Sequence, residues 1–462
     1  MNTPVALRRV LPFRTVVSTS TGLAYAAVSL LGCVQLASTL GGDSGWIAIV
    51  IAGLLAYLAA LCFSELNALY PSASAIRQYM KEAFNDNFSL IITFGYMLTI
   101  VAVIAADSYI VGSAITYAFG LPNWASLIWI LALLGLAMGV NLRGIKIAGM
   151  LQDIATYMLL IVAVAISLIA LSQHGFHLRM PFDAFSHPGD LLNGVAIGVF
   201  VFSAFEWVTP LSEEIANIRL IPRGMFLSLL LLLISYVLFT VASSNVLDLH
   251  NSAVASSPVP QLLLGKAALG QLGIWIMLLA TLLTAIMTFN GGFATASRFL
   301  YAAAREDTLP PIFARISITF AVPYVTVIML TVFSALIAII IFLTNQFQLL
   351  ILLGAVLEAI IYTIAGLCVI RLRRRKQDAE RSFRIKGGLI IPFATVIIFG
   401  LLGVLASLGI GTAGVMIGTP LIITFVVFLL SSLYVFFGVP RIRAAAMARR
   451  ATTRRRPPKR EQ

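Results

Sequence analysis

The segment LLNGVAIGVFVFSAFEWVTPLSEEIANIRLIPRG, Leu191 to Gly224, decides how the rest of the chain is interpreted. It begins as an apolar helix of membrane-spanning length, carries one carboxylate at Glu206 and ends in a polar string. A charged side chain at the centre of a bilayer costs about 2.5–3.5 kcal/mol on insertion scales. We therefore expect Glu206 to face a protein partner, a water-filled cavity or a substrate path, not lipid.

The composition is that of a membrane protein. Of 462 residues, 60% are hydrophobic and 11% are charged, and the mean hydropathy is +1.00. A helix needs about 20 apolar residues to cross the hydrocarbon core, and about twelve such stretches are present. The predicted spans are 15–40, 46–69, 90–119, 124–140, 148–171, 191–211, 225–246, 272–302, 322–343, 349–370, 389–408 and 415–437.

Basic residues predict the orientation of these spans. If the spans alternate in direction, all but Arg179 and Lys266 of the 31 lysines and arginines fall on one side. The positive-inside rule makes that side cytoplasmic and places both termini there, in a multi-pass membrane protein. The first span lacks a cleavage pattern and is expected to be retained. The predicted organisation is an N-terminus (1–14), five helices (15–171), an outer loop (172–190), five helices (191–370), a basic loop (371–388), two helices (389–438) and a basic tail (439–462).

The net charge of +13 follows from this orientation and does not indicate nucleic-acid binding. The Arg-rich tail from Arg441 to Arg460 is expected to be a disordered cytoplasmic end, with contact to anionic lipid headgroups as the alternative.

Metal and enzyme chemistry find no support in the motifs. Cys33, Cys62 and Cys368 all fall in apolar spans and form no ligand spacing. The four histidines fall in predicted outer loops without an accompanying cluster of carboxylates or thiols. No GxSxG, HExxH, Walker or dinucleotide motif is present. We expect no metal, no cofactor and no enzymatic activity.

Three carboxyls are predicted to lie deep in the membrane: Asp107 in span three, Glu206 in span six and Glu358 in span ten. Glu65 and Asp153 lie nearer the cytoplasmic helix ends, where we expect water to solvate them. Each deep acid has two interpretations that the sequence leaves open. It is a structural group bonded to hydroxyls and backbone, or it carries a proton or binds a cationic group.

Two spans contain signs of a broken helix. Span six has Ser203 and Ala204 among large residues and Pro210 four residues after Glu206. Span one contains the small, hydroxyl-rich STSTGLAYAAVSLLG, residues 18–32. Interrupted helices expose backbone groups that bind the charged ends of substrates near the bilayer centre. The two spans are five apart, the offset expected of two inverted five-helix repeats followed by an extra pair.

Five segments together resemble the amino acid-polyamine-organocation (APC) superfamily of secondary transporters, over most of the chain. They are FSAFEWVTPLSEEIANIRLIPRG (202–224), FNGGFATASRFLYAAAREDTLPPIFARI (289–316), GWIAIVIAGLLAYLAALCFSELNALYPSA (45–73), VNLRGIKIAG (140–149) and LRRRKQDAERSFRIKGGLIIP (372–392). The resemblance implies an all-α fold with broken first and sixth helices, the LeuT-like 5+5 inverted repeat, plus two C-terminal helices. It also implies alternating access, with the substrate held between the two breaks, and a location in the inner or plasma membrane.

The resemblance also assigns residues to the substrate site. The amides that receive a substrate carboxylate fall on Ala27, Val28 and Ser29, where this chain lacks both glycines of the family pattern. Close backbone approach is what glycine permits. The preceding GLAY, which ends at Tyr25, is similar to amine and polyamine importers of the superfamily, and Tyr25 joins the predicted site.

On the side of span six, Phe200 matches the family's aromatic gate. The carbonyls that hold a substrate ammonium fall on Phe200, Val201 and Ser203, and Glu206 matches the family's acid.

The resemblance leaves the coupling ion open. The span-five lysine of some proton-coupled members falls near Leu159, so a coupled proton would be carried by Asp107, Glu206 or Glu358. Oxygen ligands for Na⁺, the less favoured ion, would come from Thr288 and Asn290.

The predicted function is secondary transport of amino acids, by proton coupling or exchange. The alternative is transport of amines or polyamines by the same fold, and Glu358, which departs from the family, favours substrates with extra positive charge if it faces the pocket. A transport-inactive sensor and a membrane enzyme are less favoured. The sequence leaves monomer and homodimer open.

Overall fold

The computed structural model describes residues 11–39, 44–72, 74–143, 146–178, 188–213, 215–249, 251, 254, 257–317, 320, 322–409 and 416–454. The helices are α1 (Phe13–Ala24), α2 (Ala27–Thr39), α3 (Gly45–Leu69), α4 (Ala75–Ala83), α5 (Asp86–Ala118), α6 (Ala125–Leu142), α7 (Lys146–His174), α9 (Pro188–Val201), η1 (Phe205–Glu213), η2 (Ile218–Leu220), α10 (Ile221–Val246), α12 (Pro260–Arg305), η3 (Pro311–Ala314), α13 (Tyr324–Thr344), α14 (Phe347–Arg375), α15 (Ile390–Leu408), α16 (Thr419–Leu433), η4 (Tyr434–Gly438) and α17 (Val439–Arg454). Among the described residues, extended pairing is confined to one bridge between Leu11 and Ile215.

The predicted all-α membrane architecture is confirmed. Eleven helices of the described chain are long and apolar enough to cross a bilayer, and α1 with α2 makes a twelfth when the bent pair counts as one span. Apolar side chains such as Leu136, Leu343 and Phe425 remain 65–74% exposed on the outer surfaces of these helices. Such a surface matches lipid, because lipid tails do not penalise exposed apolar groups.

The two predicted helix breaks are present. The chain bends by 55° between α1 and α2, where Tyr25 and Ala26 leave the helix. The sixth span ends as an α-helix at Val201 and resumes at Phe205 as the 3₁₀ helix η1. Between them Ala204 has φ +72°, a conformation that residues with a side chain rarely adopt.

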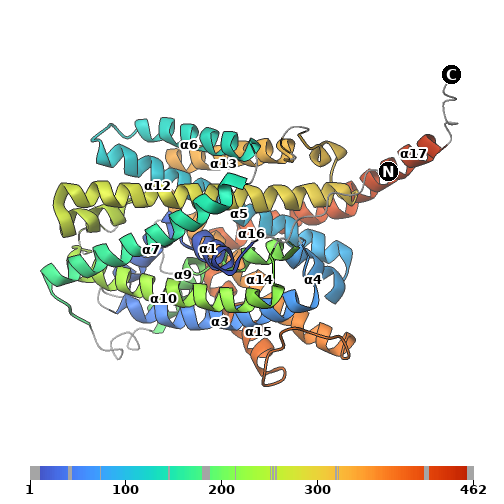
Figure 1. Cartoon of the computed structure of the whole chain (residues 1–462), viewed down its shortest axis with the longest axis horizontal. Coiled ribbons are helices and arrows are strands. Elements are labelled where there is room, and N and C mark those ends of the chain that lie inside the picture. The colour runs from blue at the N-terminus through green and yellow to red at the C-terminus, as the bar shows by residue number, and fades with distance from the viewer. Residues whose placement is uncertain are drawn as a thin grey trace.

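The broken helices pack against each other with their halves paired. α1 contacts η1, and α2 contacts α9. Each half of the first broken span therefore lies beside the opposite half of the sixth, as two inverted repeats require. α1 lies near the middle of the molecule, with α7 and α10 packed against it (Figure 1).

A sharp turn at Gly270 divides α12 into a short helix before the turn and a long membrane-spanning helix after it. Leu269 and Gly270 have non-helical backbone angles, and Gly270 has φ +60°. The helix folds back on itself so closely that a Cβ on Gly273 would lie 1.8 Å from the Gly265 carbonyl oxygen. Glycine is required there because the two backbones meet.

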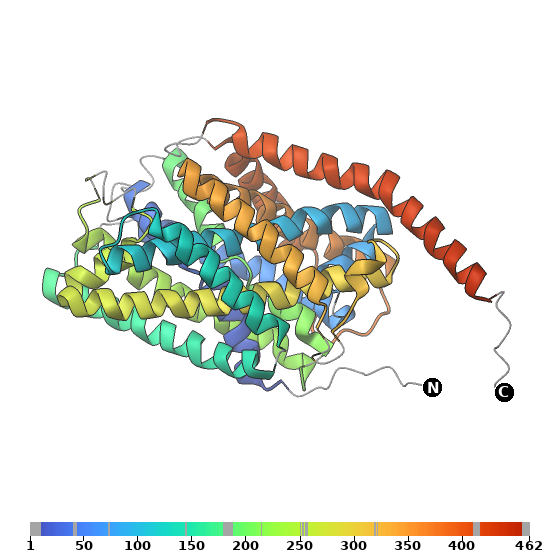
Figure 2. The ribbon, with the colours of Figure 1, turned by 90° about the horizontal axis from the view of Figure 1, so that it is seen from above.

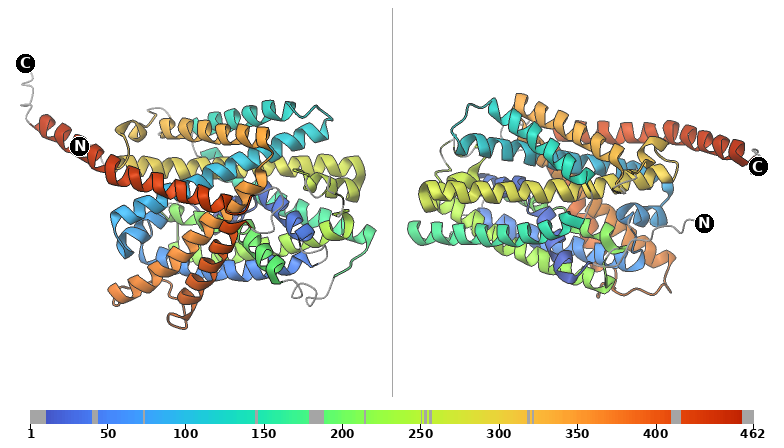
Figure 3. Two further views of the ribbon diagram at one scale, coloured as in Figure 1. Left: turned by 180° about the vertical axis from the view of Figure 1, so that it is seen from behind. Right: turned by 45° about the horizontal axis from the view of Figure 1, so that its top comes forward.

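Two α-helices, α4 and α17, lie wholly outside the predicted spans. The connection after α3 contains the amphipathic helix α4, and its buried Arg77 forms ion pairs with Asp86 and Glu306. The expectation of a disordered tail is wrong for residues 439–454, which form α17 and continue α16 through the π-helical turn η4. α17 projects away from the helical body (Figures 2 and 3). Residues 455–462 of the tail lie outside the described residues.

The expectation that water solvates Glu65 is also wrong. Its carboxylate is 2% exposed and accepts from Arg373 at 2.5 and 2.7 Å, from Arg381 at 2.7 Å and from the Ile385 amide at 2.9 Å. The basic loop after α14 therefore folds back over the end of α3. Glu65 holds this loop in place. The contact could not be predicted from the residues of span two, because the two arginines lie more than 300 residues away in the sequence.

We predict that Glu65→Gln destabilises the protein by about 3 kcal/mol, because removing one partner of a buried ion pair leaves the other charges uncompensated. The measurement is the Tm of the purified protein in detergent.

Glu82→Gln is the matched control. Glu82 is half-buried and pairs with Lys376 at 2.9 Å, and the hydrogen bond from Lys376 lowers the pKa of the Glu82 carboxyl. Exposed pairs contribute at most about 1 kcal/mol. Equal Tm values for Glu65→Gln and the wild type would show that the ion pairs of Glu65 with Arg373 and Arg381 do not stabilise the fold.

Candidate functional site

The carboxylate of Asp107 binds the free amides at the start of α2. Asp107 lies on α5 and is fully buried. It accepts from the Val28 amide at 2.9 Å and from the Ala27 amide at 3.4 Å. The first amides of a helix lack intrahelical partners and attract anions. The amides that the family resemblance assigns to a substrate carboxylate are thus bound here by a carboxylate of the chain itself.

The carbonyl side of the same break is satisfied by hydroxyls. The Ala24 carbonyl accepts from the Tyr236 hydroxyl at 2.7 Å and from Ser29 Oγ at 2.9 Å. Tyr25 stacks on Tyr236 with ring centroids 5.1 Å apart, and its hydroxyl lies 2.6 Å from Ser235 Oγ. Tyr25, a predicted substrate ligand, is therefore directed to α10 in this structure. Its role in binding stays a prediction.

A hydrogen bond joins the two breaks. Ser20 on α1 donates from its hydroxyl to the carbonyl of Phe205, 2.8 Å away at the start of η1. Ser20 belongs to the hydroxyl-rich stretch that predicted the first break. This contact ties the interrupted helices to each other at the level of the predicted substrate site.

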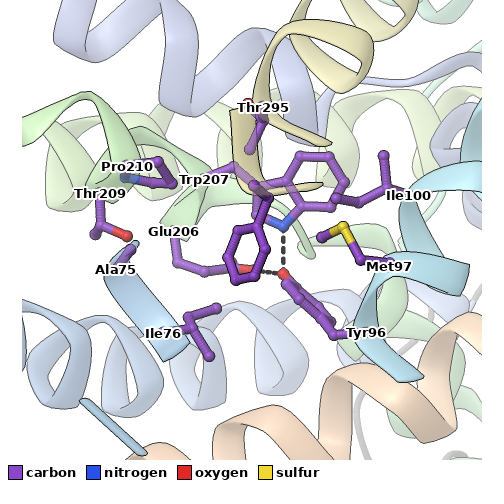
Figure 4. Close-up of a pocket in the computed structure, with 11 residues that line it drawn as sticks. Ala75, Ile76, Tyr96, Met97, Ile100, Glu206, Trp207, Thr209, Pro210 and Thr295 are labelled. Atoms are coloured by element: carbon purple, nitrogen blue, oxygen red, sulfur yellow. Dashed lines mark hydrogen bonds between the residues drawn. The ribbon is translucent and has the colours of Figure 1, made fainter. Parts of the chain in front are cut away.

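Glu206 is held by tyrosines from two other helices. Tyr96 on α5 donates to Oε1 at 2.5 Å, and Tyr362 on α14 donates to Oε2 at 3.1 Å. The indole N–H of Trp207 donates to the Tyr96 hydroxyl. Figure 4 shows Tyr96 lying between Glu206 and Trp207. The chain Trp207–Tyr96–Glu206–Tyr362 bridges η1, α5 and α14.

A narrow cavity lies beside this chain of hydrogen bonds. Its walls come from α4, α5, η1 and α12 (Figure 4). Ile76, Met97 and Phe299 supply apolar surface, and Glu206 supplies the only carboxylate of the lining. Tyr96 and Glu206 both line the cavity, so one end of this hydrogen-bonded chain forms part of its wall.

Phe200 packs tightly on α14. A Cβ on Gly354 would lie 2.3 Å from the Phe200 ring, so glycine is needed for the ring to occupy this position. The Phe200 carbonyl accepts from the Ser203 amide at 2.9 Å, within the turn that interrupts span six. Phe200, Val201 and Ser203 are all buried. Their roles as gate and ammonium ligands stay predictions.

Glu358 is fully buried, and neither carboxyl oxygen has a hydrogen-bond partner among the described residues. It lies near enough to Glu206 for the two carboxyls to interact electrostatically. The three deep acids of the sequence are therefore in three different states. Asp107 binds amides, Glu206 binds tyrosines, and Glu358 has no bonded partner in the part of the chain described.

The predicted sodium ligands do not converge in this structure. Asn290 accepts from the side-chain amide of Asn141 on α6 at 3.0 Å. Thr288 lies beside the Asp107 carboxyl, outside good hydrogen-bonding geometry, and its hydroxyl has no described partner. A sodium site at these residues stays a prediction.

The sequence predicts that Asp153, like Glu65, lies near a helix end and is solvated by water. In the structure Asp153 is only partly solvated. Its side chain is 15% exposed. It accepts from Thr15 at 3.0 Å and from the Ser18 hydroxyl, and so connects α7 to α1.

Two predicted outer-loop histidines, His187 and His250, lie outside the described residues.

Sequence reasoning missed the tyrosines of the site. Tyr96, Tyr236 and Tyr362 are fully or almost fully buried and each donates to a group at a helix break. The available signal was a phenol within an apolar span, because a buried hydroxyl needs a partner. That signal says only that a partner exists. Its identity depends on how α5, α10 and α14 pack.

Comparison with known proteins agrees with this geometry. Residues 12–441 match the family model for amino acid permeases. The chain belongs to the amino acid permease family. The permease is 26% identical over 394 residues to large neutral amino acids transporter small subunit 2 of Oryctolagus cuniculus, covering 80% of this chain and 71% of that protein.

Two further relatives are similar. Asc-type amino acid transporter 1 of Homo sapiens is 24% identical, with 80% of the permease and 73% of the relative covered. The branched-chain amino acid permease BcaP of Bacillus subtilis (strain 168) is 22% identical, with 85% and 84% covered. The resemblance to the APC superfamily is thereby confirmed, and the permease is a membrane transporter.

We predict that Tyr96→Phe lowers the saturated transport rate by about tenfold, because a hydrogen bond to a charged group contributes about 1.5–3 kcal/mol. Tyr109→Phe is the control. It lies on the same helix, and its hydroxyl donates to Asn345 at 3.0 Å, away from Glu206. Initial uptake rates in proteoliposomes measure the effect, and equal rates for the two variants would contradict a role for the Glu206 network.

Proposed function

We propose that this permease is a secondary active transporter that moves amino acids across the cytoplasmic membrane by alternating access. The observation that carries the proposal is the pairing of the two broken helices, α1 with η1 and α2 with α9. In this structure side chains such as Asp107 and Tyr236 hold the backbone amides and carbonyls that the two interruptions release there. These groups match the two charged ends of an amino acid.

In this proposal each end of the substrate has a partner in the breaks. The ammonium group binds carbonyls in the turn at Phe200 to Ser203. The carboxylate binds the amides of Ala27 and Val28 after displacing Asp107. The proposal places both termini on the cytoplasmic side and has the tyrosines on Glu206 close the site toward that side.

The proposed coupling is to protons or to exchange of a second substrate. By the family resemblance the coupling lysine falls near Leu159, which is fully buried among apolar groups. A transported proton would therefore be carried by one of the three deep acids.

The test is uptake and counterflow of labelled amino acids by the purified permease in proteoliposomes. We expect saturable uptake, and accelerated uptake when unlabelled amino acid is present inside. Linear uptake without counterflow would contradict alternating access and favour a channel. Absence of both uptake and ligand-dependent thermal stabilisation for every amino acid would overturn the proposal.

A second candidate function, transport of amines or polyamines, is favoured by one observation. Asp107 already fills the amide site with a carboxylate, so a substrate needs no carboxylate of its own. An amine would then bind with Asp107 as its counter-charge.

Asp107→Asn separates the two candidates, because the substitution keeps the side chain's shape and removes its charge. If amino acids are the substrates, we expect their apparent affinity to rise, because the competing anion is gone. If amines are the substrates, we expect their binding to fall by about tenfold or more, since a hydrogen-bonded counter-charge is lost. The measurement is the shift in Tm with amino acids and with their decarboxylated amines. A rise in the apparent affinity for amino acids would support amino acid transport. A loss of amine binding without such a rise would support amine transport.

A further inference from the structure

Glu358 is the one described carboxyl group whose two oxygens are both buried and unbonded. An ionised carboxylate offers about four acceptor sites, and a protonated one still needs an acceptor for its hydroxyl. Buried polar groups in native proteins almost always have partners, so each exception calls for an explanation. Here neither protonation state is satisfied by the described chain alone.

The position of Glu358 links it to the proposed substrate site. Gly354 and Tyr362 lie one turn before and one turn after it, so the three residues share a face of α14. On that face Gly354 contacts the Phe200 ring, and Tyr362 donates to Glu206. Glu358 therefore lies between the aromatic side chain at the end of α9 and the acid at the start of η1.

No described lysine or arginine is among the groups that act on the Glu206 and Glu358 carboxyls. Ion pairs of the described residues join Arg14, Arg77, Lys81, Arg373, Lys376, Arg381 and Arg443 to acids near the helix ends. None involves Glu206 or Glu358. Two neighbouring carboxyls thus share one buried region without a described cation, although an opposite charge is what stabilises buried acids.

We propose that Glu358 forms a subsite for the positively charged side-chain end of a basic amino acid. A guanidinium group presents five N–H donors and an ammonium group presents three, and either satisfies both oxygens that the described chain leaves unbonded. The inference rests on the proposed function and specifies its substrate class as amino acids with a basic side chain. The names of the three relatives refer instead to large neutral amino acids, to asc-type transport and to branched-chain amino acids.

The test compares ligands that differ in charge but little in shape. Arginine is paired with citrulline, and lysine with norleucine, in uptake and Tm measurements on the full-length permease. We expect the wild type to bind the basic member of each pair at least about tenfold more tightly, as hydrogen bonds to charged groups imply. Glu358→Gln should remove that preference, so that arginine binds no more tightly than citrulline and lysine no more tightly than norleucine.

Glu82→Gln is the control, because it removes a carboxylate from the half-buried pair with Lys376 and is remote from the site. It should retain the preference for basic ligands. Glu358→Asp is the second variant, for use if Glu358→Gln folds poorly. It keeps the negative charge and should retain part of the preference for basic ligands.

Three outcomes would overturn the inference while leaving the proposed function in place. The first is that citrulline and norleucine bind the wild type as tightly as arginine and lysine. The second is that Glu358→Gln reduces the binding of basic and neutral substrates equally, which would assign Glu358 to coupling or packing. The third is that Glu358→Gln abolishes proton-driven accumulation and preserves the preference for basic ligands. By contrast, a wild type that takes up no amino acid refutes the proposed function itself.

Discussion

Interrupting a helix inside a membrane releases backbone amides and carbonyls that lipid cannot satisfy, and the protein must supply partners for them. This permease does so with side chains from neighbouring helices. Asp107 binds the amides of α2, Tyr236 and Ser29 bind the Ala24 carbonyl, and Ser20 binds the Phe205 carbonyl. α5 and α10 must therefore lie against the broken helices. The packing around the site follows from this requirement.

The same requirement relates stability to function through four buried acids. Glu65 is neutralised by two arginines and fixes the basic loop. Asp107 and Glu206 accept from amides and tyrosines, which are partners that a substrate or a moving helix can replace. Glu358 has no described partner. Glu65 is thus held by opposite charge, whereas Glu358 has no described hydrogen-bond partner. Glu358 lies where we propose that the basic side chain of the substrate binds.

Much of the fold was predictable because hydrophobic length and helix-breaking residues are local properties. The twelve spans and the breaks near Ser203 and in residues 18–32 follow from the sequence. The contacts between helices at the site were not predictable, since they join residues 79 to 212 positions apart, as in Asp107 with Val28 and Tyr236 with Ala24. Composition also misjudged residues 439–454, because charge indicated disorder where the helix continues.

The central claim is that the break at Ser203 lies in a substrate site reached alternately from each side. Labelling of Ser203→Cys tests it most directly, in a background without Cys33, Cys62 and Cys368, which are all buried. With a membrane-impermeant thiol reagent, we predict labelling from either face of the membrane and protection by transported substrate. A variant that transports normally, yet is labelled from one face only and at a rate that substrate does not change, would contradict the account.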